Sequence, residues 1–72
     1  MKALVTGAGG FLGGAIARTL RERGDDVRGF SRGAHPGLAA YGIEHHQGDV
    51  AELDAVIYAT RGVDVVFHTA AG

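Results

Sequence analysis

The sequence contains no cysteine and no tryptophan, and it has a single proline and a single lysine. Without cysteine, disulfide frameworks, cysteine-ligated zinc sites and thiol nucleophiles are all excluded. No apolar run is long enough to cross a bilayer, and the first one, Ala3-Leu4-Val5, is too short for the core of an export signal. We therefore expect no membrane segment and a cytoplasmic location.

Charge is also sparse, because 21% of the 72 residues are charged and the net charge is -1, against an apolar fraction of 46%. This balance excludes intrinsic disorder. Six basic and three acidic residues precede position 37, and one basic and five acidic residues follow it. Because this asymmetry falls short of a dense basic stripe, we expect neither nucleic acid nor anionic membranes as partners. The length allows one small domain or a piece of a larger one.

Glycine is abundant, with 13 residues, and the segments between the glycines alternate in type. Apolar runs predict strands at 2–6, 27–31, 43–47 and 63–68. Helical spacing predicts helices at 10–23, 36–41 and 49–61. Such alternation indicates a parallel sheet with right-handed crossovers. The predicted fold is therefore α/β, the N-terminal half of a doubly wound Rossmann-type sheet with four strands and about three helices.

Two of these helices carry apolar stripes that we expect to be buried. The stripe of the first helix consists of Leu12, Ile16 and Leu20, with Phe11, Ala15 and Thr19 beside it. The stripe of the third helix consists of Leu53, Val56 and Ile57. Asp49 and Glu52, three residues apart, predict a start like a capping box for this third helix.

A glycine-rich segment, Thr6-Gly7-Ala8-Gly9-Gly10-Phe11-Leu12-Gly13, lies between the first predicted strand and the first predicted helix. The spacing of Gly7, Gly10 and Gly13 suits a tight turn, a close approach of backbone to a pyrophosphate, and close packing of helix on strand. The helix N-terminus would add oriented N–H donors for the anion. The alternative is a turn that merely connects two elements. A Walker-type loop is disfavoured because no Lys-Ser/Thr pair follows these glycines.

Three motifs in this order resemble the extended short-chain dehydrogenase/reductases, also called the NAD-dependent epimerase/dehydratase family. They are the segment from Lys2 to Gly13, then Gly48-Asp49-Val50, and finally Asp64-Val65-Val66-Phe67-His68-Thr69-Ala70-Ala71. The resemblance covers essentially the whole sequence. Within the family, the ending Phe67-His68-Thr69-Ala70-Ala71-Gly72 looks most like the 3-beta-hydroxysteroid dehydrogenase and sterol-dehydrogenase branch.

The resemblance implies a set of cofactor-binding residues. Gly7, Gly10 and Gly13 would form the phosphate loop, with Phe11 and Leu12 beside the pyrophosphate. Asp49 would accept a hydrogen bond from the adenine amino group, Val50 would pack on the ring, and Ala70 and Ala71 would line the cofactor. For Asp49 the structural alternative is a helix cap, which is compatible with the adenine role. For the two alanines it is a place in the core.

The end of the second predicted strand favours NADP over NAD. An NAD site usually has a carboxylate there for the ribose hydroxyls, about 20 residues beyond the glycine motif. This sequence has Ser31 and Arg32 instead, and Asp25 and Asp26 come before the strand. Arg32 would pair with the 2′-phosphate and Ser31 would donate to it. The alternative is that Arg32 is a solvent-facing loop residue, or stacks on adenine without a phosphate.

The family's chemistry uses a tyrosine with a lysine four residues later, and this pair is missing. Tyr41 is followed at that distance by His45 and Tyr58 by Gly62. We therefore expect the N-terminal portion of a longer enzyme, without its catalytic and substrate-binding parts and inactive alone. The full enzyme would act on a sugar nucleotide, a steroid or a similar alcohol or carbonyl. The alternatives are a non-catalytic NADP-sensing module and a truncated product without stable function.

The four histidines do not form a predicted metal site. His45 and His46 are neighbours on a predicted strand and would point to opposite faces, so they cannot ligate one ion together. His35 lies in a loop, and His68 ends a strand, where it would either touch a ribose or have no role beyond the strand end.

Overall fold

The computed structural model describes residues 1–69 and contains seven elements in strict alternation of strand and helix. In chain order they are β1 (Lys2–Thr6), α1 (Phe11–Glu22), β2 (Asp26–Ser31), α2 (Pro36–Ala40), β3 (Glu44–Gln47), α3 (Leu53–Ala59) and β4 (Val65–His68). The prediction of four strands and three helices in an α/β fold is therefore confirmed. No helix within residues 1–69 is long and apolar enough to cross a membrane.

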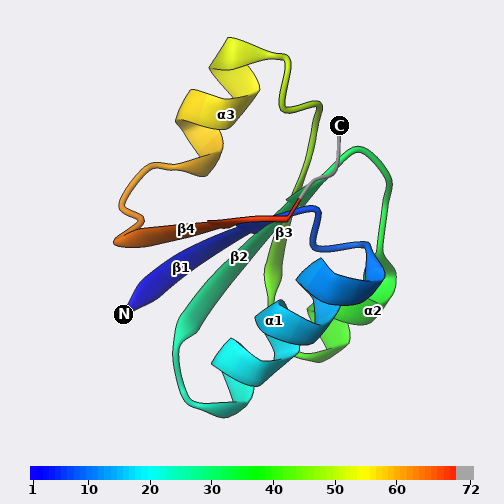
Figure 1. The fold of residues 1–72 in the computed structure, drawn as a ribbon, viewed down its shortest axis with the longest axis vertical. Helices are drawn as coiled ribbons and strands as arrows, with labels where there is room; N and C mark the ends of the chain where they lie inside the picture. The colour runs from blue at the N-terminus through cyan, green and yellow to red at the C-terminus, as the bar shows by residue number, and fades with distance from the viewer. Residues whose placement is uncertain (70–72) are drawn as a thin grey trace.

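The four strands form one parallel sheet in the order β3-β2-β1-β4. The chain first builds the sheet outward from β1 to β3 and then returns through α3 to place β4 on the other side of β1. Figure 1 shows α1 and α2 on one face of the sheet and α3 on the other. The change of direction beside β1 is a topological switch point, where open α/β sheets bind their ligands.

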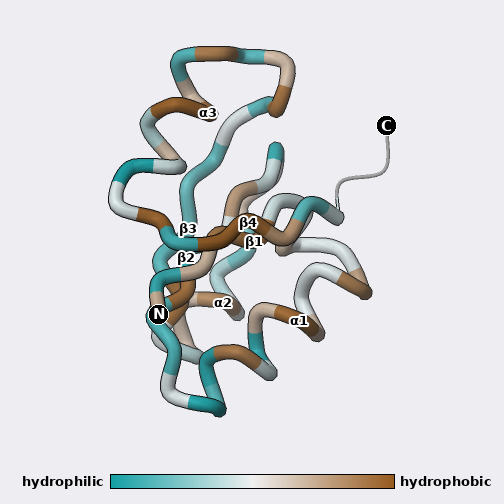
Figure 2. The backbone as a smooth tube through the Cα atoms, turned by 60° about the vertical axis from the view of Figure 1, so that its left-hand side comes forward, coloured by the Kyte–Doolittle hydropathy of each residue, from teal (hydrophilic) through white to brown (hydrophobic). Residues whose placement is uncertain are grey.

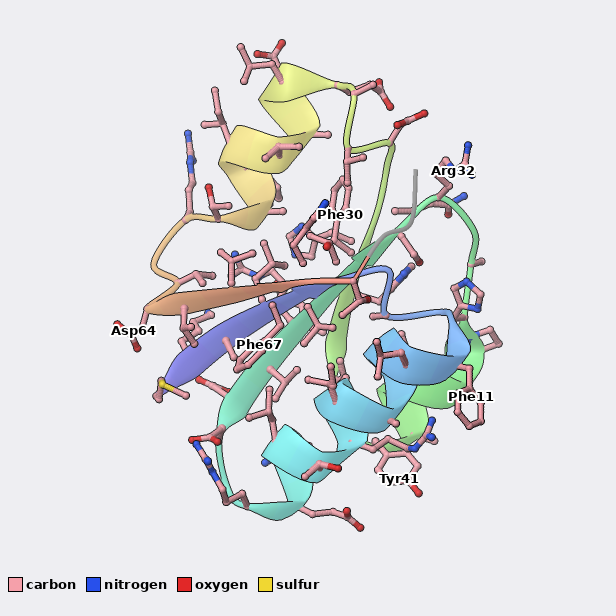
Figure 3. The ribbon with its side chains drawn as sticks, in the orientation of Figure 1. Phe11, Phe30, Arg32, Tyr41, Asp64 and Phe67 are labelled. Carbon is pink, nitrogen blue, oxygen red and sulfur yellow. The ribbon has the colours of Figure 1, made fainter. Side chains whose placement is uncertain are left out.

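Strand β1 lies at the centre and is buried on both faces, as its continuous apolar run predicts. Ala3 and Val5 belong to the cluster under α1 and α2, whereas Leu4 belongs to the cluster under α3. The tube in Figure 2 is coloured hydrophobic along this central part of the sheet. Figure 3 shows Phe30 on the α3 side of the sheet and Phe67 on the α1 side, so both faces receive an aromatic side chain.

Element ends follow local hydrogen bonding and differ from the predicted bounds by a few residues. Ile43 is buried but precedes β3, because its N–H bonds to the carbonyl of Leu38 and closes α2. Gly42 adopts a φ of +76° in this closure, which is a Schellman-type helix end. Val63 likewise precedes β4. The carboxylate of Asp64, just before the strand, accepts a hydrogen bond from the N–H of Lys2 at 2.8 Å.

The predicted stripe of α1 is wrong in its first turn. Phe11 is 96% exposed and Leu12 is also exposed, whereas the buried residues of the helix are Gly13, Gly14, Ala17 and Leu20. Two glycines and an alanine let the helix axis approach the sheet closely, so the large side chains at its start turn outward instead. Figure 3 shows Phe11 pointing away from the body of the protein at the start of α1.

The predicted stripe of α3 is wrong at Leu53 and Ile57 and right at Val56. Leu53 and Ile57 are 71% and 50% exposed, and the side that packs on the sheet carries Ala55, Val56 and Ala59. The helix starts at Leu53, four residues later than predicted, and its N-cap residue makes no side-chain cap bond. The small residues set the contact face, because they allow the closest approach of α3 to the sheet.

Candidate functional site

A cavity of about 440 Å³ opens at the carboxyl ends of β1 and β2, in front of the N-terminus of α1. Four separate segments of the chain contribute to its wall. The lining residues are Gly7, Gly10, Phe11, Leu12, Gly13, Phe30, Ser31, Arg32, Gly48, Asp49, Val50 and Thr69. They include nine residues that the sequence singled out. Ala70 and Ala71, the other two predicted cofactor-binding residues, lie outside the residues that the structure describes.

The first glycine of the loop is required by the backbone. Gly7 has a φ of +69°, a conformation that residues with a side chain rarely adopt. Its N–H donates to the carbonyl of Phe30 at 2.8 Å, and its own carbonyl accepts from the N–H of Gly10 at 2.9 Å. The turn is thereby tied to the end of β2.

The third glycine is required by packing. A Cβ on Gly13 would lie 2.1 Å from the carbonyl oxygen of Gly7 and 2.6 Å from Oγ1 of Thr69. Thr69 is itself held by β1, because its N–H and its hydroxyl both bond to Thr6. Gly13 is thus the point where α1, the glycine loop and the end of β4 meet.

The second glycine has no such requirement from the fold. Gly10 has an ordinary φ of -82°, and a Cβ there would find only the carbonyl oxygen of Gly7 within 4 Å, at 3.4 Å. It is the N-cap of α1, where no side chain caps the helix and no acidic residue occupies the first turn. The unpaired N–H groups of that turn and the positive end of the helix dipole therefore face the cavity, an arrangement suited to an anion.

The end of β2 supplies the charged side of the cavity. Ser31 is half-buried and Arg32 is exposed, and both line the wall. Within residues 1–69 no carboxylate pairs with the guanidinium of Arg32. The backbone carbonyl of Arg32 accepts a hydrogen bond from the side-chain amide of Gln47. Figure 3 shows Arg32 in the loop after β2, at the same end of the sheet as the C-terminal ends of the other strands.

The segment after β3 forms the opposite wall through Asp49 and Val50. Asp49 does not cap α3; its Oδ1 accepts from the N–H of Ala51 at 2.9 Å, in a turn before the helix. The carboxylate of Glu52 accepts from the N–H of Asp49 at 3.1 Å, so only this half of the predicted capping box forms. Within residues 1–69 no donor is bonded to the other carboxylate oxygen of Asp49, a residue of the cavity wall.

Sequence reasoning missed three residues of the wall: Phe30, Gly48 and Thr69. Gly48 and Thr69 stand inside the motifs that carried the family resemblance, so the signal was present. A Cβ at Gly48 would be tightly packed, 3.1 Å from the ring of Phe30 and 3.2 Å from Cβ of Ala55. Phe30 lies outside those motifs, and no local pattern marks it as a residue of the wall.

The histidines lie on both sides of the sheet. His45 contacts Ser31 and the ring of His35, whereas His46 contacts Glu44 and Tyr58, so the two neighbours do point to opposite faces. Burial lowers the pKa of His45 below its ordinary value of 6.5, and the charges of His35 and His46 lower this pKa further. Within residues 1–69 no group of three or more His, Asp or Glu side chains is arranged to hold a metal ion.

The fourth histidine, His68, belongs to the α3 side of the sheet. Its Nδ1 lies 2.7 Å from the hydroxyl of Thr6 across the β1–β4 pair. It does not line the cavity described above but a second, apolar one of about 280 Å³ beneath α3. The position at the strand end, with a hydrogen bond to the neighbouring strand, agrees with a structural role for this side chain.

Comparisons with known proteins agree with this geometry. The sequence profile of the NAD dependent epimerase/dehydratase family matches residues 3–72. A 2-alkyl-3-oxoalkanoate reductase from Stenotrophomonas maltophilia is 51% identical over 99% of this chain, and a 3 beta-hydroxysteroid dehydrogenase/Delta 5-->4-isomerase from Mycobacterium tuberculosis is 43% identical over 97%. The chain spans 22% and 19% of the length of these two relatives.

A solved structure is similar in fold as well as in sequence. It is a short-chain dehydrogenase/reductase superfamily protein from Agrobacterium tumefaciens with bound NAD, which matches with a TM-score of 0.85 and 33% identity. The match covers 100% of this chain and 21% of that one. The parallel sheet with its glycine loop thus corresponds to the N-terminal half of the Rossmann-like sheet of these proteins. Because the family profile matches residues 3–72, this chain belongs to the NAD dependent epimerase/dehydratase family.

Proposed function

We propose that the chain forms the cofactor-binding portion of an NAD(P)-dependent oxidoreductase or epimerase. The observation that carries this proposal is the cavity, where nine predicted residues from the glycine loop, the end of β2 and the segment after β3 meet in front of the α1 N-terminus. A nicotinamide cofactor, when bound, supplies a carbon that accepts or donates a hydride. The described residues supply the binding and orientation of that cofactor.

The cavity suits the pyrophosphate of a dinucleotide. The uncapped first turn of α1 offers N–H donors, and Gly10 leaves open the space that a Cβ would fill on the cavity side. One oxygen of Asp49 is bonded within its turn, and the other, which has no donor among residues 1–69, would accept from an adenine amino group. Val50 is 45% exposed in the wall and offers an apolar surface for the base.

We further propose that NADP is preferred to NAD. The residues that line the cavity at the end of β2 are Ser31 and Arg32, a hydroxyl and a guanidinium, and neither can accept from two ribose hydroxyls as a carboxylate does. Arg32 has no anionic partner among residues 1–69, so its charge is available to the 2′-phosphate.

For the whole protein we propose a substrate with an alcohol or carbonyl group, such as a sugar nucleotide or a steroid. The two relatives named above act, by their names, on an oxoalkanoate and on a hydroxysteroid. The first name describes a reductase, and the second describes a dehydrogenase that is also an isomerase. They favour the apolar alcohol or carbonyl over the sugar nucleotide.

The test is a calorimetric titration of the purified chain with NADP and with NAD, followed by amide NMR. We expect saturable binding of both, tighter for NADP, with shifts concentrated at residues 7–13, 31–32 and 48–50. Binding of neither nucleotide to a chain with well-dispersed amide signals would reject the proposed function. Equal or tighter binding of NAD would reject only the preference for NADP.

A further inference from the structure

The hydroxyl of Ser31 has two polar neighbours, and their chemistry determines where its proton points. Oγ lies 3.2 Å from the carbonyl oxygen of Gly33 and 2.6 Å from Nε2 of His45. A carbonyl only accepts, so a hydrogen bond to Gly33 uses the single hydroxyl proton. In that arrangement Nε2 of His45 carries a hydrogen and donates it to Oγ.

Packing holds the His45 ring in this position. Gly29 on β2 lies beside the ring, and a Cβ there would make an ordinary contact with its Cδ2 at 3.6 Å. On its other side the ring of His35 stands edge-on, with the two centroids 5.8 Å apart. His35 in turn covers Gly9, where a Cβ would collide with the imidazole. The two rings therefore connect the wall of the cavity at Ser31 with the glycine loop.

We propose that His45 is a positioning residue that favours NADP by fixing the hydroxyl of Ser31. While Nε2 donates to Oγ, the hydroxyl proton can turn from Gly33 to an oxygen of the 2′-phosphate. The bond that it leaves is long, at 3.2 Å, and the bond that it gains has an anionic acceptor and is therefore stronger. NAD carries a neutral 2′-hydroxyl instead of the phosphate, so its hydrogen bond with Ser31 would be weaker.

This inference rests on the proposed function, because it assumes that the adenosine ribose lies beside Ser31. It needs only the neutral Nε2–H form of His45. Burial lowers the pKa of His45, and two nearby charges lower this pKa further: His35, whose ring faces it from the loop before α2, and His46, its neighbour on the strand, which points to the opposite face. All of these observations agree with an uncharged ring at neutral pH.

The test compares the dissociation constants of NADP and NAD for the purified chain and three variants. His45→Leu removes the donor and is expected to weaken NADP roughly three- to tenfold, the range for one lost neutral hydrogen bond. NAD should be affected much less. His45→Gln places an amide donor near the Nε2 position and should restore the preference. The matched control is His46→Leu, on the same strand but the opposite face, which should leave the ratio of the two constants unchanged.

A measurement on the unsubstituted chain makes the test independent of how the variants fold. Long-range nitrogen–proton NMR spectra report which ring nitrogen of His45 carries the hydrogen. We expect Nε2–H, with a resonance that shifts more with NADP than with NAD. An Nδ1–H form, or an equal loss of both nucleotides in His45→Leu, would overturn the positioning role. Failure of both nucleotides to bind the unsubstituted chain would reject the proposed function, and this inference with it.

Discussion

The guanidinium of Arg28, in the middle of β2, donates from Nη1 to the carbonyls of Ala59 at 2.7 Å and Arg61 at 3.0 Å. Its Nε donates to the carboxylate of Glu44 on β3 at 2.8 Å. Arg28 is only 8% exposed, so one buried cation satisfies the C-terminal carbonyls of α3 and joins that helix to the sheet. A helix whose contact face consists mainly of small residues is thereby held by polar bonds as well as by packing.

Arg28→Ala should destabilise the chain by about 2–4 kcal/mol, because it leaves buried carbonyls without donors. Arg28→Lys should recover only part of this loss, since an ammonium cannot reproduce the fork of the guanidinium. Urea denaturation followed by circular dichroism measures both. The control is Arg23→Ala, which removes an arginine whose side chain is 63% exposed in its pair with Asp25, and it should cost no more than about 1 kcal/mol. Equal losses for Arg28 and Arg23 would contradict the role of Arg28.

Within the glycine loop, we expect Gly10 to be required for binding the nucleotide and Gly13 to be required for folding. Gly10→Ala meets only a contact of 3.4 Å in the fold, so it should change stability by about 1 kcal/mol or less and still weaken NADP and NAD at least about tenfold. Gly13→Ala drives a Cβ into the carbonyl of Gly7 and should cost about 3 kcal/mol or more. Calorimetric titration and urea denaturation of both variants test this pair. Retention of full affinity in a folded Gly10→Ala chain would be the contrary result.

The order of elements and most of the cavity were predictable because their signals are local. Gly42 ends a helix through its own backbone angle, and the glycine loop follows directly on a buried apolar run. The contact face of α3 was not predictable in this way. Leu53 and Ile57 follow helical spacing as well as Val56 does, and only the place of Arg28 and the small residues on the sheet side decides which face is buried.

The second group of unpredicted features depends on alignment between strands. The contact of Ser31 with His45 exists because β2 and β3 pair in the register Gly29 with His45 and Ser31 with Gln47. A shift of one residue would place His46 on that face instead. No local pattern in the sequence specifies this register, and the histidine that contacts the cavity wall could therefore be identified only in the structure.

Acidification should destabilise the fold, and His45 should account for part of the effect. Its pKa is lowered in the folded chain, mainly by burial, so the unfolded chain takes up a proton first as the pH falls below about 6.5. Stability is therefore full above this value and is lost as the pH falls through the lower, folded pKa. Thermal melts at pH 7.5 and 5.5 should show a smaller drop for His45→Gln than for the unsubstituted chain. An identical drop would exclude His45 as a contributor.

A second loss of stability is expected at more acidic pH from Glu44. The hydrogen bond with His46 lowers the pKa of this carboxyl below 4.5, burial opposes the change, and the charge of Arg28 adds to it. The carboxylate therefore stabilises the fold above about pH 4.5, and this contribution disappears as the pH falls through the lower, folded pKa. Glu44→Gln should flatten the dependence of the melting temperature on pH below this value. A steeper dependence in the variant would show that the sign is wrong.

Arg32 should determine the preference between the two nucleotides, because it is the cation of the cavity wall with no carboxylate partner among residues 1–69. Arg32→Ala should weaken NADP about 10- to 100-fold, the range for a lost charge-assisted bond, and leave NAD within about twofold. Arg18→Ala is the matched control, since that arginine lies over the ring of Tyr41 and outside the cavity. The NADP affinity should also fall with added salt in the unsubstituted chain and less so in Arg32→Ala. If both nucleotides weaken equally, the guanidinium instead stacks on the adenine that they share.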